Sequence, residues 1–280
     1  MNKTGLVFDE SYLLHETHSH PECKERLIAI KEWLKKVQLY SNLIPVKPES
    51  ISDEVLAYVH PSYYSQKLAS FCNKGGGYLD PDTFTSVDSY RVALLAAGGA
   101  VKAVEEVVSG RLQNCVVLGR PPGHHASEDK AMGFCLLNNV AIAARFSQKN
   151  LGLKRIMIID WDAHHGNGTE KIFYNDPGVL FFSIHESRLF PGTGFIKNSG
   201  ENQGLGYNIN IPVPKGSGDY TYRYIFDKIL IPVIKQYRPE LILISAGFDG
   251  YYQDELAGLE ITSSGFKEMT QQIMLISEKT

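Results

Sequence analysis

Acidic and imidazole side chains follow one apolar run closely enough to hold a metal ion. The run 156–159 is rich in β-branched residues, which is typical of a buried parallel strand. Asp160, Asp162 and His164 follow two residues apart, and His165 completes the group. Side chains two apart share a side of an extended segment, so Asp160, Asp162 and His164 can converge on one point. An Asp-x-His pair with an open side suits a hydrolytic zinc ion. The alternative is a strand end whose polar residues face solvent.

A second reactive group follows a strand predicted at 115–118. The sequence Arg120-Pro121-Pro122-Gly123-His124-His125-Ala126 combines prolines and glycine, which stiffen a turn, with a tandem histidine. His124 and His125 on such a turn are placed for proton transfer. The alternative is a loop with surface histidines.

Two more polar segments end predicted strands. Ser183-Ile184-His185-Glu186 closes the strand 179–184, and His185 could be either a metal ligand or a supporting imidazole. Asp249 follows the apolar run 241–245 and stands between glycines. Ligands of open α/β sheets bind at the carboxyl ends of the strands, so Asp249 is expected beside Asp162 as a further metal ligand.

The chemistry available to these residues is metal-assisted hydrolysis of an amide. A zinc ion held by Asp162, His164 and Asp249 would polarise a carbonyl and acidify a water molecule. One histidine of the pair His124 and His125 would move the proton, and the other, if charged, would stabilise the oxyanion.

The elements that must position these residues alternate between strand and helix. Strands are expected at 6–8, 115–118, 155–159, 179–184, 207–211 and 241–245. Helices are expected at about 21–40, 53–59, 62–72, 89–108, 138–146, 220–236 and 264–276, with a loop at 73–83. This alternation predicts an α/β fold with an open, doubly wound, mostly parallel sheet flanked by helices. We expect a single domain, 1–280.

The first long helix and the loop before it are less informative. Leu27, Ile30, Trp33, Leu34 and Val37 are spaced to form one apolar face. The preceding loop carries three histidines, for which we expect hydrogen bonding within the loop in preference to a metal site. These histidines are His15, His18 and His20.

Composition and charge argue against a nucleic-acid-binding or membrane-spanning protein. The formal net charge is -3, and 43% of the residues are hydrophobic and 21% charged, which argues against a nucleic-acid-binding surface. No apolar stretch is long enough to cross a membrane, and we expect no signal peptide because residues 1–9 lack an apolar h-region. The scattered cysteines read as reduced thiols of a cytoplasmic protein. They are Cys23, Cys72, Cys115 and Cys135.

Taken together, these motifs resemble those of the zinc-dependent histone deacetylase family, within the arginase/deacetylase fold. The Arg120–Ala126 motif and Asn167 resemble the class II branch and its bacterial relatives, which include acetylpolyamine amidohydrolases and acetoin-utilisation proteins. The resemblance implies zinc bound by Asp162, His164 and Asp249.

The resemblance also implies roles for the catalytic groups. His125 would be the general base and acid, and His124 its electrostatic partner. Asp160 would then orient His124 and would not be a zinc ligand. Asn167 would orient His125. A monovalent cation, usually K⁺, would be bound by the Asp160 carboxylate, the Ser183 hydroxyl and main-chain oxygens that include that of Ile184.

Further positions match the substrate tunnel of the family. Gly133 and Phe134 would form one aromatic wall and Phe190 the other, with packing in the core as the alternative for both phenylalanines. Arg26 matches an arginine that lines a channel beneath the metal; without the resemblance it would be read as a solvated helix residue.

One departure concerns a family tyrosine that hydrogen-bonds the substrate carbonyl from a glycine-rich loop after one more strand. The sequence ends at Thr280 before such a loop, and Gly75-Gly76-Gly77-Tyr78 lies elsewhere, before the alanine-rich helix. We therefore expect a C-terminally truncated form. If the 280 residues are the whole protein, we expect weak or absent turnover with zinc binding retained.

The leading hypothesis is a zinc-dependent enzyme that hydrolyses the amide of an acetylated amine, either an acetylated lysine peptide or a small acetylated amine such as an acetylpolyamine. One alternative is a catalytically impaired, zinc-containing acyl-binding homologue. Another is a binuclear ureohydrolase on the same fold, which would need more acidic ligands. No direct nucleic-acid or membrane partner is expected, and whether the chain forms a homo-oligomer is left open.

Overall fold

The computed structural model describes residues 3–277 and divides into two compact units, 1–151 and 152–280. Each unit contains a parallel sheet and flanking helices, which confirms the predicted α/β class with mostly parallel strands. The expectation of a single domain stays a prediction. No helix within residues 3–277 is long and apolar enough to cross a bilayer.

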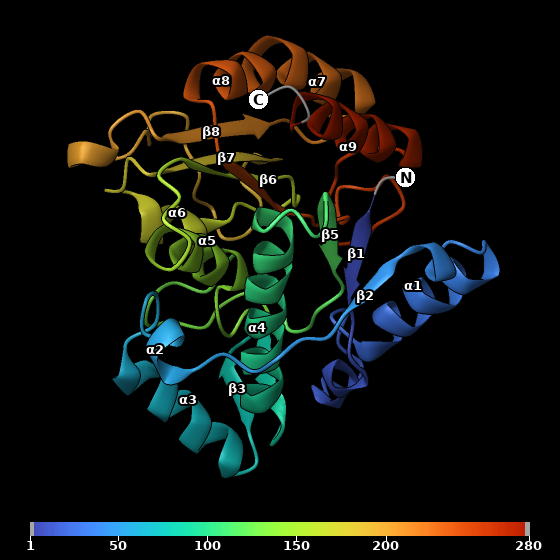
Figure 1. Ribbon diagram of the computed structural model, residues 1–280, viewed down its shortest axis with the longest axis vertical. Coiled ribbons are helices and arrows are strands. Elements are labelled where there is room, and N and C mark those ends of the chain that lie inside the picture. The colour runs from blue at the N-terminus through green and yellow to red at the C-terminus, as the bar shows by residue number, and fades with distance from the viewer. Residues whose placement is uncertain (1–2, 278–280) are drawn as a thin grey trace. The chain divides into compact units, whose positions relative to one another are not determined.

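The first unit is built on a three-stranded parallel sheet in the order β2-β1-β5 (Figure 1). The long helix α4 packs against β1, β5 and α5, and its small residues allow that close approach. Its strands and helices are β1 (Thr4–Val7), α1 (Lys24–Lys36), β2 (Ile44–Val46), α2 (Asp53–Leu56), α3 (Ser62–Asn73), β3 (Gly77–Asp80), β4 (Thr83–Thr85), α4 (Ser89–Val108), β5 (Asn114–Val117) and α5 (Asn139–Lys149).

Helix α1 is shorter than predicted, and most of its apolar face is not buried. It begins at Lys24 and ends at Lys36, and Gln38 just beyond it takes a left-handed φ of 57°, which no helix continues. Of the expected apolar face only Leu27 is buried, whereas Trp33 is 59% exposed. The apolar face expected for this helix is therefore mostly not buried.

The segment predicted as a loop at 73–83 instead contains an antiparallel hairpin, β3–β4. Asp80 closes the turn by accepting a hydrogen bond from the Asp82 amide at 2.9 Å. Tyr78 and Phe84 face each other across the strands with ring centroids 5.0 Å apart. This aromatic pair stabilises the hairpin. The hairpin was not predicted because the glycines and aspartates of the segment are typical of a loop.

The second unit carries a four-stranded parallel sheet in the order β8-β7-β6-β9. Helix α6 was not predicted, since the segment after the first metal motif reads as a glycine-rich turn. The expected helix at 220–236 is present as α7 and α8 joined by a π-helical segment, Phe226–Leu230. The elements are β6 (Ile156–Asp160), α6 (Asn167–Phe173), β7 (Val179–Glu186), β8 (Asn208–Val213), α7 (Asp219–Ile225), α8 (Ile231–Tyr237), β9 (Leu241–Ser245) and α9 (Ser263–Ser277).

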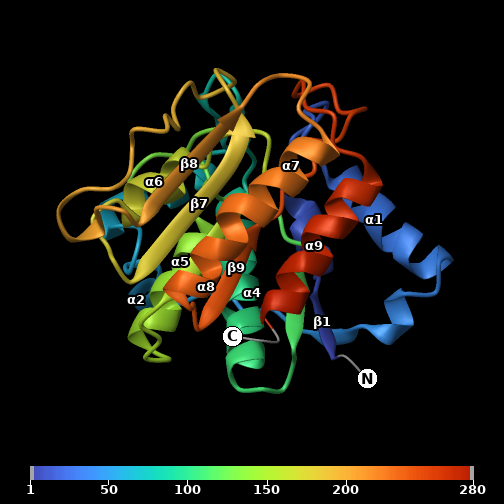
Figure 2. The same cartoon turned by 90° about the horizontal axis from the view of Figure 1, so that it is seen from above.

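The core of the second unit follows from the alternation of side chains along its strands. Met157 and Ile159 of β6 and Phe182 of β7 pack with residues of α7, α8 and α9 in one buried cluster. Helix α6 lies on the opposite side of the sheet from α7 and α8 (Figure 1), and α7 and α9 run side by side (Figure 2). Helices on both faces bury β6 and β7 completely and leave the strand ends for polar groups.

Candidate metal centre and catalytic residues

The metal-ligand candidates converge because β6 and β9 are neighbours. Asp160, the last residue of β6, pairs with Ser245, the last residue of β9. Both strands are parallel, so the loops that follow them leave the same edge of the sheet. Asp162, His164 and Asp249 lie in these loops, and their donor atoms are all within 4.8 Å of one another.

His164 is the centre of this group. Its Nδ1 atom lies 2.7 Å from Asp249 Oδ2 and 3.2 Å from Asp162 Oδ1. Main-chain amides hold both carboxylates: His164 N–H donates to Asp162 Oδ1 at 2.8 Å, and Ala163 N–H donates to Asp249 Oδ1 at 3.0 Å. The positions of the donor atoms are therefore set by the backbone of residues 162–164.

The electrostatics of the group match a cation site. Burial disfavours a charged His164, but the hydrogen bonds to Asp162 and Asp249 outweigh burial and raise its pKa to about 10. Burial and the charge of Asp162 raise the pKa of Asp249 to about 6. Two carboxylates thus face each other in a partly desolvated site, where a positive charge between them is strongly favoured.

The residues fit a zinc ion. One imidazole nitrogen and two carboxylate oxygens are a donor set that hydrolytic zinc sites use, with a further position left for water or substrate. The backbone of Gly247 passes close to the Asp162 carboxylate, and a Cβ at this position would lie 2.1 Å from Asp162 Oδ2. Only glycine lets this backbone pass so near the ligand.

Asp160 lies outside this group, so the expectation from spacing alone that it converges with Asp162 and His164 on one point is wrong. Its side chain accepts a hydrogen bond from the Asp162 amide at 3.2 Å and packs beneath Gly166, where a Cβ would approach Asp160 Oδ2 to 2.3 Å. Asp160 is fully buried. The supporting role that the resemblance implies for Asp160 stays a prediction.

The other predicted residues of this unit lie close to Asp160 in the sheet. Ser183 is the partner of Asp160 across β6 and β7, and both Ser183 and Ile184 are fully buried. Asn167 is the first residue of α6, and its amide donates to the His165 carbonyl at 2.8 Å. The cation site at Asp160, Ser183 and Ile184 and the catalytic role of Asn167 stay predictions.

In the first unit the tandem histidines are buried next to each other. The rings of His124 and His125 have centroids 4.0 Å apart, and the residues are 8% and 5% exposed. The turn that carries them is tied to the start of α5, since Asn139 donates to the Pro121 carbonyl and Asn138 to the Ala126 carbonyl, each at 3.0 Å. The alternative of surface histidines is therefore wrong.

His60 holds the segment after this turn, a role that no sequence signal suggested. Its Nδ1 donates to the Glu128 carbonyl at 2.8 Å, and its Nε2 accepts from the Asn138 amide at 2.9 Å. Since the carbonyl can only accept and the amide can only donate, the ring is neutral with its proton on Nδ1. Burial lowers the pKa of His60 to about 4.

Arg120 anchors the other end of the turn. It is 1% exposed, and its guanidinium grips the buried Glu22 carboxylate through two hydrogen bonds of 2.6 and 2.8 Å. A third hydrogen bond of 2.9 Å goes to the His15 carbonyl. The His15 side chain bonds the Ser89 hydroxyl at the start of α4 at 2.7 Å, so its partner lies outside the histidine-containing loop.

Phe134 and Phe190, expected as tunnel walls, occur in different units and are described separately. Phe134 is half-buried beside the buried Gly133, and the edge of His20 meets its ring with centroids 4.4 Å apart. His20 is fixed by the Glu22 amide at 3.0 Å and by Asp82 at 3.2 Å. These contacts hold the ring of Phe134 at a defined angle.

Phe190 is 42% exposed, too much for a core residue, and its ring stands edge-on to His164 with centroids 6.3 Å apart. A wall beside the metal group fits this position better than packing in the core. The Arg26 side chain is 54% exposed, and its guanidinium pairs with Glu22 at 3.4 Å. Its place in a channel stays a prediction, as does any role of Tyr78, which is 65% exposed.

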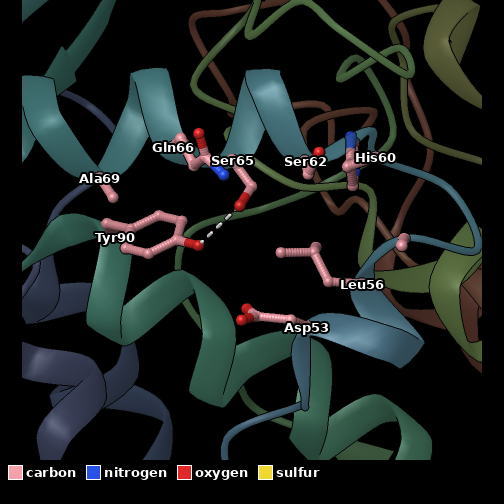
Figure 3. A pocket seen from close by; sticks show the side chains of 9 residues that line it. Asp53, Leu56, His60, Ser62, Ser65, Gln66, Ala69 and Tyr90 are labelled. Carbon is pink, nitrogen blue, oxygen red and sulfur yellow. Dashed lines mark hydrogen bonds between the residues drawn. The ribbon is translucent and has the colours of Figure 1, made fainter.

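A separate cavity of about 230 Å³ lies among α2, α3 and α4. Figure 3 shows Asp53 on one side of it and the hydroxyls of Ser65 and Tyr90, 3.2 Å apart, across from it. None of the predicted catalytic residues lines this cavity. Its lining residues are Asp53, Leu56, Ala57, His60, Ser62, Ser65, Gln66, Ala69 and Tyr90.

The similarity of the chain to known proteins extends over nearly its whole length. The Histone deacetylase domain family matches residues 20–280. A probable deacetylase of Archaeoglobus fulgidus is 42% identical over 279 residues, which cover 99% of this chain and 77% of the relative. A histone deacetylase-like amidohydrolase of Pseudomonas aeruginosa is 34% identical, over 99% of this chain and 78% of the relative.

A solved structure shows the same fold. The crystal structure of the HDA15 HD domain matches with a TM-score of 0.94 and 37% identity, covering 98% of this chain and 80% of that one. At this identity the match supports more than the fold. The chain therefore belongs to the histone deacetylase family and is a hydrolase of its deacetylase and amidohydrolase group.

Proposed function

We propose that the chain is a zinc-dependent amidohydrolase that removes the acetyl group from an acetylated amine. The substrate is an acetyl-lysine side chain in a peptide or a small acetylated amine such as an acetylpolyamine. The observation that carries the proposal is the group formed by Asp162, His164 and Asp249, whose donor atoms gather within 4.8 Å at one sheet edge.

These three residues would hold one Zn²⁺. When bound, the ion supplies a Lewis acid for the amide carbonyl and lowers the pKa of a water molecule. The amides of residues 163 and 164 keep the carboxylates of Asp249 and Asp162 turned toward His164, so the donor set is organised by the chain itself.

His124 and His125 would move the proton. Two positive imidazoles 4.0 Å apart repel each other, so the two rings are not charged at the same time. We assign the neutral ring to His125, which takes the proton of the attacking water and passes it to the leaving amine nitrogen. His124 keeps its charge and stabilises the negative charge that develops on the carbonyl oxygen. Asp160 and Asn167 would orient the two rings.

The substrate chain would lie against aromatic walls. Phe134 and Phe190 offer flat apolar faces suited to the methylene chain of a lysine or polyamine. A K⁺ ion would support the metal loop from the Asp160 carboxylate, the Ser183 hydroxyl and the Ile184 carbonyl. The Ser183 hydroxyl donates its proton to His185 Nδ1 at 2.9 Å, which leaves its lone pairs for a cation.

Acetate release from the zinc-loaded chain tests the proposal. An acetyl-lysine peptide and an acetylated diamine serve as substrates, and His125→Ala is compared with His18→Ala, which changes an exposed histidine. We expect slow but measurable release by the unmodified chain and by His18→Ala, and a further loss of about 10²-fold to 10⁴-fold in kcat for His125→Ala with zinc content unchanged. Equal rates for the His125 variant, or zinc-loaded chain that binds these substrates without releasing acetate, would overturn it.

A further inference from the structure

Residues 187–198, the first part of the segment between β7 and β8, are held by side chains that do not belong to the metal group. This segment carries Phe190, whose ring stands beside His164. Leu189 at its start packs against the core of the second unit, but farther along Phe195 is 54% and Ile196 is 74% exposed. Hydrophobic burial therefore helps to hold only the start of this segment, and polar contacts restrain residues 193–198.

His185 provides the first anchor. It is 1% exposed at the end of β7, and its Nε2 donates to the Gly194 carbonyl at 3.0 Å. Its Nδ1 accepts from the Ser183 hydroxyl at 2.9 Å. Both ring nitrogens are thus used, and the tautomer is determined because a carbonyl can only accept.

His165 provides the second anchor and is 2% exposed. Its Nδ1 lies 2.8 Å from the Thr193 hydroxyl, and its ring is next to that of His185, with centroids 4.7 Å apart. Its Nε2 lies 3.3 Å from Glu170 Oε2, close enough for electrostatic attraction although not aligned for a hydrogen bond. The carboxylate of Glu170 keeps the ring oriented from α6.

Gly194 shows how closely the loop is seated on the two rings. Its φ is 81°, and a Cβ there would lie 2.3 Å from His185 Nε2 and 2.7 Å from His165 Cδ2. No side chain fits between the loop and the imidazole pair.

Two asparagines of β8 also hold this segment by hydrogen bonds to its main chain. Asn208 donates to the Asn198 carbonyl at 2.7 Å, and Asn210 donates to the Phe195 carbonyl at 3.5 Å. Both also donate to Glu170 Oε2, at 2.8 and 2.6 Å. Strand β8, helix α6 and the histidine pair therefore form one polar network beneath residues 193–198.

We infer that His165 and His185 are positioning residues, which act through Thr193 and Gly194 to set the place of Phe190 beside the metal group. This rests on the proposed function, in which Phe190 is a wall of the substrate tunnel. Phe190 lies only three residues before Thr193, so a shift of the anchored segment moves the wall. Neither histidine needs to touch the substrate.

Thr193 offers a matched pair of variants. Thr193→Val removes the hydroxyl that His165 bonds and keeps the side-chain shape, whereas Thr193→Ser keeps the hydroxyl. For Thr193→Val we expect KM for an acetyl-lysine peptide to rise about threefold to tenfold, because one partly buried hydrogen bond is lost, with kcat and zinc content unchanged. The preference for acetyl over butyryl lysine peptides should weaken in the same variant. Thr193→Ser should behave as the unmodified chain.

Amide hydrogen exchange supplies a readout that does not depend on turnover. Exchange in 187–198 should quicken in Thr193→Val and in Gly194→Ala, and stay unchanged in Thr193→Ser. If both Thr193 variants match the unmodified chain in exchange, KM and acyl preference, or if Thr193→Val loses kcat alone, the inference is wrong. Absence of turnover in the unmodified chain, together with the expected exchange pattern, would instead count against the proposed function only.

Discussion

His164 directs its Nδ1 atom at the Asp249 carboxylate, 2.7 Å away, across 85 residues of sequence. The pairing of β6 with β9 brings the two loops together, and main-chain amides fix the carboxylates. The metal group is therefore a product of the sheet order, and its geometry depends on backbone as much as on the ligand side chains.

Gly247 should be required for metal binding although it offers no donor atom. In Gly247→Ala the new Cβ would meet Asp162 Oδ2 at 2.1 Å and push that carboxylate out of the group. We expect zinc affinity to fall by roughly tenfold or more, as for other changes that displace a ligand indirectly. Competition with a zinc-chelating dye measures the affinity.

The control for this experiment is Gly250→Ala, in the same loop. Its Cβ would meet the flexible end of Ile261 at 3.0 Å and no ligand. Equal zinc affinities of the two variants would show that the close approach at Gly247 has no part in shaping the site.

The buried pair Arg120 and Glu22 should be needed for stability. Arg120→Met would leave the Glu22 carboxylate buried without its bidentate partner, and the free energy of unfolding should fall by about 3–5 kcal/mol. Urea unfolding measures the loss. Arg111→Ala, which breaks the exposed pair with Glu106, should leave the midpoint unchanged. A stable Arg120→Met protein would contradict the assigned role of the pair.

Buried histidines should make the chain acid-sensitive. Burial lowers the pKa of His60 to about 4 from its ordinary value of 6.5, so the unfolded chain binds a proton as the pH falls below about 6.5 while the folded chain does not. The free energy of unfolding should therefore fall between pH 6.5 and pH 4 and level off below that for this group. His15 and His185 add to the fall, since burial lowers each pKa to about 4.

His60→Gln isolates one part of this slope. The free energy of unfolding, measured with denaturant between pH 7 and pH 4, should decline less steeply in the variant than in the unmodified chain. Above pH 7 the curves of this free energy against pH should be parallel for the two proteins. An identical decline in both would mean that His60 is not buried in its neutral form.

Elements built from local patterns were predictable. Helix α4 runs over Ser89–Val108 as predicted, because its small and apolar residues recur with helical spacing and Gly110 follows its end. Asp162, His164 and Asp249 were recognised because each follows a buried apolar strand, and neighbouring parallel strands bring such residues to one edge. The inference needed only strand positions and residue types.

Pairings between distant segments were not predictable in the same way. The Glu22 carboxylate meets Arg120 across 98 residues, and nothing near either residue indicates the other. The hairpin β3–β4 depends on a contact between Tyr78 and Phe84 that composition does not show. Spacing alone also predicted that Asp160 lies with the metal ligands. Its side chain instead packs against Gly166 and accepts a hydrogen bond from the Asp162 amide.

The zinc content of the purified chain tests the central claim most directly. Elemental analysis after dialysis should find about one zinc ion per chain in the unmodified protein. The control variant Glu255→Ala, which removes an exposed acid from the loop that carries Asp249, should also bind about one zinc ion. Asp249→Ala should retain less than about a tenth of that zinc, because it deletes one of three protein ligands. Full zinc content in Asp249→Ala, or none in the unmodified chain after incubation with zinc, would contradict the assignment of the metal centre.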